Sequence, residues 1–259
     1  MEGEKMKSFI GWIGGKNHLK KLIIPLIPDD CKRYIEVCGG AGWVLFGKEK
    51  VSNQMEVFND IDGDLINLYI QIKTNCEELQ HELDWLHSRE LFRLFRYEIE
   101  NQIPLSEVQR AARYLYLIKS SFGSNRYSFA TSTKTLYRIV DELPTYRDRL
   151  KDVIIEQLDF EQLIKTYDRP DALFYIDPPY VGSEKYYNKK YCHFTLSDHV
   201  RLNACLRGLK GRFILSYNDC DFVTEHYSDF KIQYVSRKNL LPSKELDRGV
   251  YKEVIITNY

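Results

Sequence analysis

The segment Asp177-Pro178-Pro179-Tyr180 combines residue types that suit chemistry on a planar amine. The carboxylate and the proline carbonyls can accept hydrogen bonds from such an amine, and the tyrosine ring can stack on the attached ring system. Prolines lack a backbone N–H, fix their own backbone angle and keep the preceding residue out of the helical region. The segment is therefore expected to hold its polar groups in a stiff, extended turn.

This turn directly follows an apolar run at 172–176, which predicts a buried strand. Two consecutive prolines cannot continue a strand, because neither donates a backbone hydrogen bond. Open α/β folds bind ligands at the carboxyl ends of their strands, so a ligand site is expected here. The alternative at this point is a strand end that carries two prolines and has no function.

A second candidate site is the glycine-rich turn formed by Gly39, Gly40 and Gly42, between a predicted strand at 34–38 and a helix from about Trp43. The third glycine of the dinucleotide fingerprint is missing, because Leu45 stands three residues after Gly42. Asp60 follows a predicted strand at 55–58, where it can accept hydrogen bonds from ribose hydroxyls. The pattern suits a nucleoside without a pyrophosphate, such as S-adenosylmethionine, at least as well as NAD.

Composition limits the class of protein. The 259 residues carry 37 Lys and Arg against 37 Asp and Glu, so net charge alone does not predict a polyanionic partner. The six cysteines form no C-x-x-C pair, which predicts reduced thiols and no metal site. No secretory signal and no apolar run of membrane-spanning length is present in the sequence. A cytoplasmic protein without a membrane partner is expected.

The distribution of charge is more informative than its sum. Between 108 and 140 there are six Lys and Arg residues and no Asp or Glu, interleaved with aromatic, Ser, Thr, Gly and Asn residues. Such a segment offers phosphate contacts, base stacking and hydrogen bonds to nucleic acid. A solvated loop between core aromatics is the alternative. The candidate DNA contacts are Lys119, Ser121, Phe122, Asn125, Arg126, Lys134 and Arg138.

The order of predicted elements indicates an α/β protein with a Rossmann-like sheet that is interrupted by a mostly helical insert. Strands are expected at 34–38, 55–58, 152–158, 173–176 and 212–217, and a strand at 254–257 is expected to close the sheet. Long helices are expected at 76–101 and 105–120, where the alternation of strands and helices breaks. The predicted domains are 1–72 with 151–259, and an insert at 73–150 that recognises the target.

Five motifs together resemble the Dam-type, or D12-class, DNA adenine N6-methyltransferases. They are FIGWIGGK at 9–16, YIEVCGGAG at 34–42, VFNDI at 57–61, DLINLY at 64–69 and FYIDPPY at 174–180, in the order of that family. The resemblance covers most of the chain outside the insert. It implies an S-adenosylmethionine-dependent methyltransferase fold and methyl transfer to the exocyclic amine of adenine in duplex DNA.

The resemblance also implies roles for individual residues. The cofactor-binding positions are Trp12, Lys16, Glu36, Gly39, Gly40, Gly42, Asp60, Asp159, Phe160 and Asp177, and the catalytic positions are Asp177, Pro178, Pro179 and Tyr180. Lys16 has a physical rationale, because a cation can meet the carboxylate of the cofactor. Lys185, Lys189 and Lys190 lie in the segment after the catalytic motif, where family members contact backbone phosphates.

The implied target atom is inaccessible inside a duplex, so the adenine is expected to flip out, with no covalent intermediate or metal. Arg126 can contact guanine and Asn125 can contact adenine, and GATC is one candidate recognition sequence. A monomer is expected, and a cognate restriction endonuclease is a candidate partner. His193 and His199 are expected on the surface or at the substrate side rather than as nucleophiles.

Four alternatives remain open from sequence. An N4-cytosine methyltransferase typically carries Ser in place of Asp177, and a protein-glutamine or RNA-adenine methyltransferase more often carries Asn. A catalytically silent DNA-binding module would share the fold, although every expected chemical group is present. An NAD-dependent oxidoreductase is disfavoured by the missing glycine.

Overall fold

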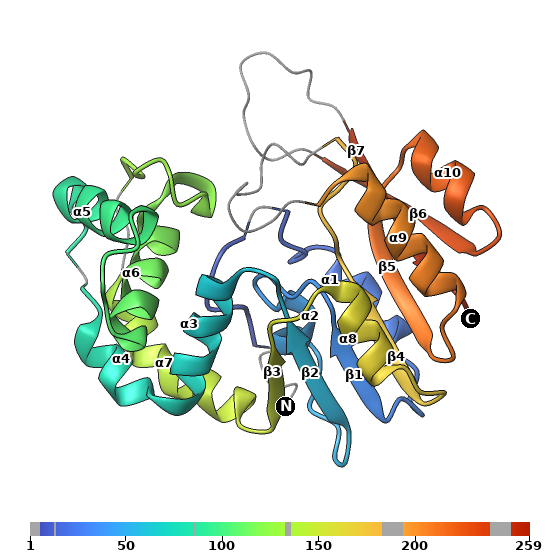
Figure 1. The fold of residues 1–259 in the computed structure, drawn as a ribbon, viewed down its shortest axis with the longest axis horizontal. Helices are drawn as coiled ribbons and strands as arrows, with labels where there is room; N and C mark the ends of the chain where they lie inside the picture. Colours follow the sequence, from blue (N-terminus) through green and yellow to red (C-terminus); the bar gives the residue numbers. More distant parts are fainter. Residues whose placement is uncertain (1–5, 13, 85, 133–135, 183–193, 239–249) are drawn as a thin grey trace.

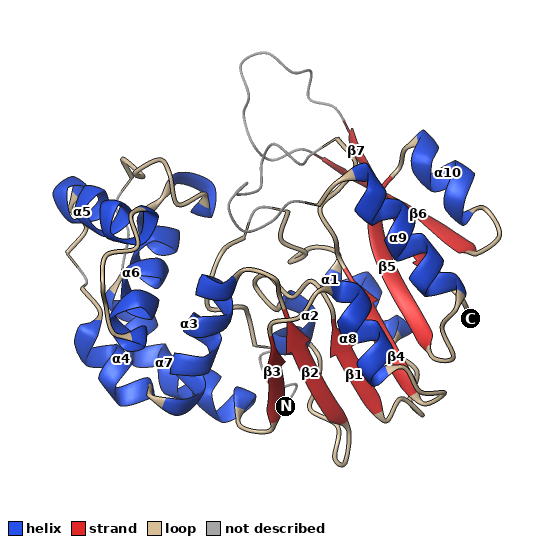
Figure 2. Cartoon of the chain, viewed as in Figure 1, coloured by secondary structure: helices blue, strands red, loops and turns tan. Residues whose placement is uncertain are grey.

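A seven-stranded sheet lies between two layers of helices in the computed structural model, which describes residues 6–12, 14–84, 86–132, 136–182, 194–238 and 250–259 (Figures 1 and 2). The strands that build the central sheet are short and rich in β-branched and aromatic residues, as buried strands are. They are β1 (Arg33–Glu36), β2 (Met55–Asn59), β3 (Val153–Glu156), β4 (Ala172–Ile176), β5 (Arg212–Asn218), β6 (Lys231–Lys238) and β7 (Val250–Thr257).

The strand order is β3-β2-β1-β4-β5-β7-β6. Strands β1 to β5 are parallel to one another, whereas β7 is antiparallel to both of its neighbours, β5 and β6. The chain moves outward from β1 through β2 to β3 and then returns to the other side of β1 as β4. The order of strands therefore reverses between β1 and β4, and open α/β sheets bind ligands beside such a reversal.

Alternation along the strands divides the sheet into two apolar faces. In β4, Leu173 and Tyr175 enter one core, while Phe174 and Ile176 enter the other. The first face is covered by α1 (Lys20–Ile23), the short 3₁₀ helix η1 (Ile24–Leu26), α2 (Trp43–Gly47) and α3 (Gly63–Thr74). The second face is covered by α8 (Phe160–Tyr167), α9 (Leu196–Arg207) and α10 (Asp221–Tyr227).

The segment between α3 and β3 is helical and stacks outward from α3, on the left of Figure 1. It contains α4 (Cys76–Glu82), α5 (Arg89–Glu100), α6 (Glu107–Ser120), the 3₁₀ turn η2 (Phe122–Ser124) and α7 (Tyr137–Leu150). Its main core is continuous with the first face of the sheet, because Leu115 of α6 and Leu143 of α7 belong to the same buried cluster as Tyr34 of β1. The domain boundaries at 73 and 150 stay a prediction.

Two expectations about the elements were wrong, and four elements were missed. The single helix expected at 76–101 is two helices, because the chain turns extended at Leu83 and the Ser88 side chain caps a new start at α5. The strand expected at 254–257 runs from Val250 and does not close the sheet, because β6 pairs along its outer side. The helices α7, α8 and α10 and the strand β6 were not expected.

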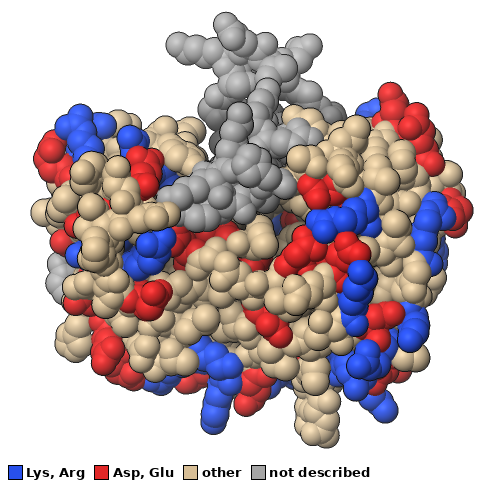
Figure 3. All heavy atoms as spheres, in the orientation of Figure 1, with Lys and Arg blue, Asp and Glu red and all other residues tan. Residues whose placement is uncertain are grey.

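No helix among the described residues is long and apolar enough to cross a membrane. Lys, Arg, Asp and Glu side chains are interspersed over the face shown in Figure 3, without a large region of one sign. This face is therefore not divided into an acidic and a basic half.

Candidate active site

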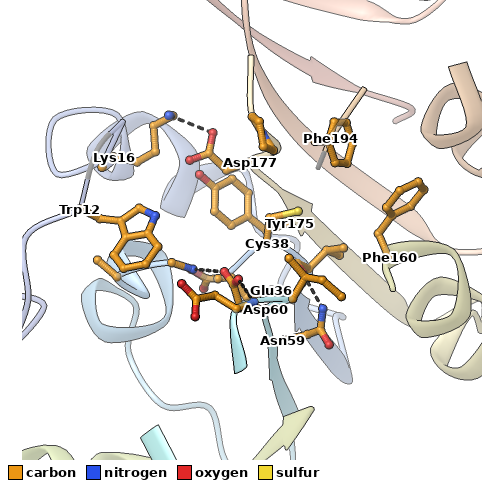
Figure 4. A pocket seen from close by; sticks show the side chains of 18 of the residues that line it. Trp12, Lys16, Glu36, Cys38, Asn59, Asp60, Phe160, Tyr175, Asp177 and Phe194 are labelled. Atoms are coloured by element: carbon orange, nitrogen blue, oxygen red, sulfur yellow. Dashed lines mark hydrogen bonds and ion pairs between the residues drawn. The ribbon is translucent and has the colours of Figure 1, made fainter. Parts of the chain in front are cut away.

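One pocket collects most of the residues that the sequence predicted for cofactor binding and catalysis. It lies at the carboxyl ends of β1, β2, β3 and β4, and Figure 4 shows side chains from distant segments converging on it. The cofactor-binding and catalytic candidates that line it are Trp12, Lys16, Glu36, Gly39, Gly40, Asp60, Asp159, Phe160, Asp177 and Pro179. Arg126, predicted as a DNA contact, also lines it. Three connections, β1 to β2, β2 to β3 and β3 to β4, bring the ends of these parallel strands together, so the location follows from the fold rather than from any one motif.

The glycine-rich turn is shaped by close approaches. A Cβ at Gly39 would lie 2.2 Å from the Phe58 ring, and a Cβ at Gly40 would lie 2.9 Å from the Trp12 ring. Gly40 also has a positive φ of 50°, which favours glycine. Gly42 does not line the pocket; it is the N-cap of α2, with a φ of 61°. Its contribution is to the turn rather than to the pocket wall.

Asp60 stands immediately after β2 and is fixed by two backbone donors. Its carboxylate accepts from the Gly40 N–H at 2.8 Å and from the Asp62 N–H at 2.9 Å. Burial raises the pKa of Asp60 to about 6, and these two hydrogen bonds oppose that rise. The carboxylate is therefore held in one orientation and can still accept hydrogen bonds from a ligand that carries hydroxyl groups.

Glu36 ends β1 and is 1% exposed. Its Oε2 accepts from the Tyr34 hydroxyl at 2.8 Å and from the Leu45 N–H at 2.9 Å. Burial raises the pKa of Glu36 to about 8, against the effect of both hydrogen bonds. At neutral pH this side chain is mainly protonated, so it can donate as well as accept a hydrogen bond at the pocket wall.

Asp177 follows β4 and is held by two side chains. Its Oδ1 lies 2.9 Å from the Lys16 Nζ and accepts from the Ser216 hydroxyl at 2.8 Å. Lys16 is 5% exposed and also donates to the Gly14 carbonyl at 2.7 Å. Burial raises the pKa of Asp177, whereas Lys16 and Ser216 lower it. The predicted contact between Lys16 and a cofactor carboxylate stays a prediction, since here Lys16 pairs with Asp177 (Figure 4).

Tyr180 is oriented from three directions. Its hydroxyl donates to Glu253 at 3.0 Å, its ring stacks on Tyr217 at 5.8 Å, and the Lys16 Nζ lies 4.6 Å from its ring centroid. Tyr217 in turn hydrogen bonds His199, which is fully buried. Of the two placements expected for His199, the surface placement is wrong, because the residue lies on the inner side of α9, and the substrate-side placement stays a prediction. His193 lies outside the described residues.

The far end of the pocket is aromatic. Phe160 and Phe194 pack 5.5 Å apart between ring centroids, and the Arg201 guanidinium lies 4.3 Å from the Phe160 ring. Asp159 caps α8 by accepting from the Glu161 N–H at 3.0 Å, and Arg201 donates to its other oxygen at 2.8 Å. A planar ring with a polar edge fits between such groups.

The candidate DNA contacts in the insert lie in several different environments. Ser121 is buried and bonds the Ile118 carbonyl and the Arg126 N–H, and Asn125 accepts two backbone N–H groups, so both build the turn after α6. Lys119 is partly buried, and burial lowers its pKa. Phe122 and Arg138 are exposed, whereas the Arg126 side chain points into the pocket. The remaining candidate DNA contacts lie outside the described residues; they are Lys134, Lys185, Lys189 and Lys190.

Several residues that line the pocket or contact its catalytic segment were missed from sequence. Ser216 contacts Asp177 from the neighbouring strand, and Asn59 donates to the Val37 and Leu158 carbonyls and thereby joins the ends of three strands. Ser216 near the end of a predicted strand was a usable signal, because parallel strands place such residues at the ligand edge. Glu253 and Arg201 carried no local signal. Among the described residues, no group of three His, Cys, Asp or Glu side chains could hold a metal ion.

Comparison with known proteins assigns the family. The family model described as D12 class N6 adenine-specific DNA methyltransferase matches residues 12–240, which is most of the chain. The protein belongs to this family. Among its relatives are the type II methyltransferase M1.LlaDCHI of Lactococcus lactis subsp. cremoris, 31% identical over 98% of this chain and 96% of the relative. The type II methyltransferase M.MjaIII of Methanocaldococcus jannaschii is 30% identical over 98% of this chain and its own full length.

A third relative, the type II methyltransferase M.CviBI of Paramecium bursaria Chlorella virus NC1A, is 30% identical over 87% of this chain and 88% of its own length. The D12-class enzyme is thus a site-specific DNA methyltransferase that acts on N6 of adenine. The cytosine, RNA, protein and nicotinamide alternatives are set aside by this assignment. The α/β class expected from sequence is confirmed.

Proposed function

We propose that S-adenosylmethionine binds in the pocket between the glycine-rich turn and Asp177. Three features of the pocket support this proposal. The backbone at Gly39 and Gly40 leaves no room for a Cβ, the Asp60 carboxylate is preset for hydroxyl donors, and the aromatic end can take a planar base. The cofactor, when bound, supplies an electrophilic methyl group.

The protein must then improve a poor nucleophile, because the lone pair of the adenine amine is delocalised into the ring. Asp177 and the Pro178 carbonyl accept hydrogen bonds from that amine and localise its lone pair. Lys16 and Ser216 hold the Asp177 carboxylate in place, so its charge is positioned before the base arrives. Tyr180, fixed by Glu253 and Tyr217, stacks on the base. The single observation that carries this role is the position of Asp177 on the pocket wall.

The adenine reaches this position by flipping out of the duplex, and the helical segment at 73–150 contacts the DNA around it. Exposed Phe122 and Arg138 are suited to stacking and to phosphate contact. The enzyme acts as a cytoplasmic monomer. Since several relatives are named type II methyltransferases, it serves in restriction–modification beside a cognate endonuclease.

The test is methyl transfer from labelled S-adenosylmethionine to unmethylated genomic DNA, followed by nucleoside analysis and modified-base sequencing. N6-methyladenine at one short motif is expected. Base flipping is tested separately with 2-aminopurine in place of the target adenine, whose fluorescence is expected to rise on binding. Labelled cofactor that binds equally well to an Asp60→Ala variant would contradict the proposed pocket.

A further inference from the structure

Arg126 connects the turn after α6 to the pocket. Its backbone belongs to that turn and has a φ of 66°, while its side chain is only 16% exposed and lines the pocket. The Nη1 lies 2.9 Å from the Asp62 Oδ2 and also contacts the Tyr114 hydroxyl. Burial alone would lower the pKa of Arg126, but Tyr114 and Asp62 raise it, so the guanidinium stays charged. A buried, paired guanidinium is poorly placed to read a guanine.

Asp62, the partner of Arg126, lies in the turn that carries Asp60. Its Oδ1 caps α3 by accepting from the Asp64 and Leu65 N–H groups, which leaves Oδ2 to accept from Arg126 and from the Tyr114 hydroxyl at 2.8 Å. The backbone N–H of Asp62 donates to Asp60 at 2.9 Å. The position of the Arg126 side chain is therefore linked, through Asp62, to the position of the Asp60 carboxylate, which is proposed to bind ribose.

A second route joins the same turn to the glycine-rich segment. The Arg126 guanidinium lies 5.2 Å from the Trp12 ring, and that ring packs against Gly40. Next to it, a Cβ at Gly11 would lie 2.3 Å from the Ser124 Oγ, so the N-terminal segment docks closely on the turn. Asp60 on one wall of the pocket, and Trp12 and Gly40 on the other, thus both depend on the position of the 121–126 turn.

We infer that Arg126 is a positioning residue that couples DNA binding by the insert to the shape of the cofactor pocket. The inference rests on the proposed function. DNA that engages the 121–126 turn fixes Arg126 against Asp62 and Trp12, and these contacts fix Asp60 and Gly40. Because coupling between two binding sites is reciprocal, the cofactor also tightens DNA binding by the same factor.

The experiment measures the dissociation constant of S-adenosylhomocysteine by calorimetry, with and without saturating unmethylated DNA. Wild-type protein is expected to bind it at least about 5-fold more tightly with DNA. Arg126→Ala and Asp62→Asn are each expected to lose this tightening, and the double variant is expected to behave as either single variant does. Asn caps helices as well as Asp, so Asp62→Asn removes the ion pair while α3 keeps its cap. Arg126→Lys, which keeps the charge, is expected to restore part of the tightening.

Arg113→Ala is the matched control. Arg113 is 18% exposed, pairs with Glu98 at 3.2 Å and lies 4.2 Å from the Phe95 ring, so it resembles Arg126 but touches no pocket residue. It is expected to keep the full tightening. An Arg126→Ala variant that keeps the tightening and only methylates additional motifs would overturn the inference in favour of base reading. Wild-type protein that binds no S-adenosylhomocysteine would overturn the proposed function, and the inference with it.

Discussion

Buried acidic residues at the two ends of the sheet have pKa values that are shifted in opposite directions. Glu56 lies near the amino end of β2 and Glu36 at the carboxyl end of the adjacent strand β1. They are 3% and 1% exposed, so burial penalises the charge of each. Their surroundings nevertheless move their pKa values in opposite directions.

At the amino end, Glu56 is fully compensated. Lys48 donates to it at 2.5 Å, and Arg149 donates to both of its oxygens at 2.6 and 2.8 Å. Burial would raise the pKa of Glu56, but these cations lower it overall. Arg149 also donates to the Leu45 carbonyl at 2.8 Å, so the cluster joins the end of α7 to α2 and β2. This charge network holds helices to the sheet.

At the carboxyl end, Glu36, Asp60 and Asp177 all have raised pKa values, because burial outweighs the donors that contact them. Perturbed acids gathered in one pocket are typical of functional sites. The difference teaches that this fold neutralises a buried charge where the charge only joins elements. At the pocket, where a ligand is proposed to complete the set of partners, the buried acids keep raised pKa values.

Glu56→Ala is expected to break this comparison most severely. It leaves Lys48 and Arg149 buried without their carboxylate, so the free energy of unfolding should fall by about 3–5 kcal/mol. Chemical denaturation measures the loss. Glu225→Ala, in an exposed position on α10, is the control and should change it by less than about 0.5 kcal/mol. An equal effect of the two substitutions would show that the cluster contributes nothing specific.

Asp177→Asn is expected to act on catalysis rather than on folding. Loss of the positioned charge should lower kcat for methyl transfer by about 10²–10³-fold. Single-turnover transfer to saturating DNA measures the effect, and thermal unfolding checks that the fold is intact. Retention of most of the activity would remove Asp177 from the catalytic role.

Glu36→Gln is expected to stabilise the protein increasingly from pH 6 to pH 8. In this range the folded state keeps the Glu36 proton, since its pKa is about 8, while the unfolded state has lost it. Wild-type stability therefore falls with pH by up to about 1.4 kcal/mol per pH unit from this group, and glutamine removes that slope. Urea unfolding of both proteins at pH 6, 7 and 8 tests this prediction. If the free energy of unfolding changed with pH equally in the wild type and in Glu36→Gln, the raised pKa of Glu36 would be contradicted.

The smallest of the expected effects is a pH dependence of cofactor affinity that arises from Asp60. Its pKa of about 6 means that the carboxylate needed for hydroxyl donors is protonated as pH falls below that value. Affinity for S-adenosylhomocysteine should drop by about tenfold for each pH unit below 6. Titration calorimetry at pH 7, 6 and 5 measures this drop. An Asp60→Asn variant should show weaker binding with little change across the range.

Much of this protein was accessible from sequence because its functional segments are short and local. The strands before Asp60 and Asp177, the glycine-rich turn and the two prolines each dictate a backbone conformation by their own composition, and their order identifies the family. Ten of the residues predicted for cofactor binding and catalysis line one pocket for this reason.

The tertiary structure alone decided which side chains act together. Ser216 meets Asp177, and Arg126 meets Asp62, across segments far apart in the chain. The basic segment at 108–140 predicted exposed DNA contacts, yet Arg126 turns inward because Asp62 and Tyr114 offer it a buried set of acceptors. Composition and spacing fix backbone preference locally, whereas the pairing of charges depends on which strand and which helix become neighbours, and only packing of the whole chain sets that.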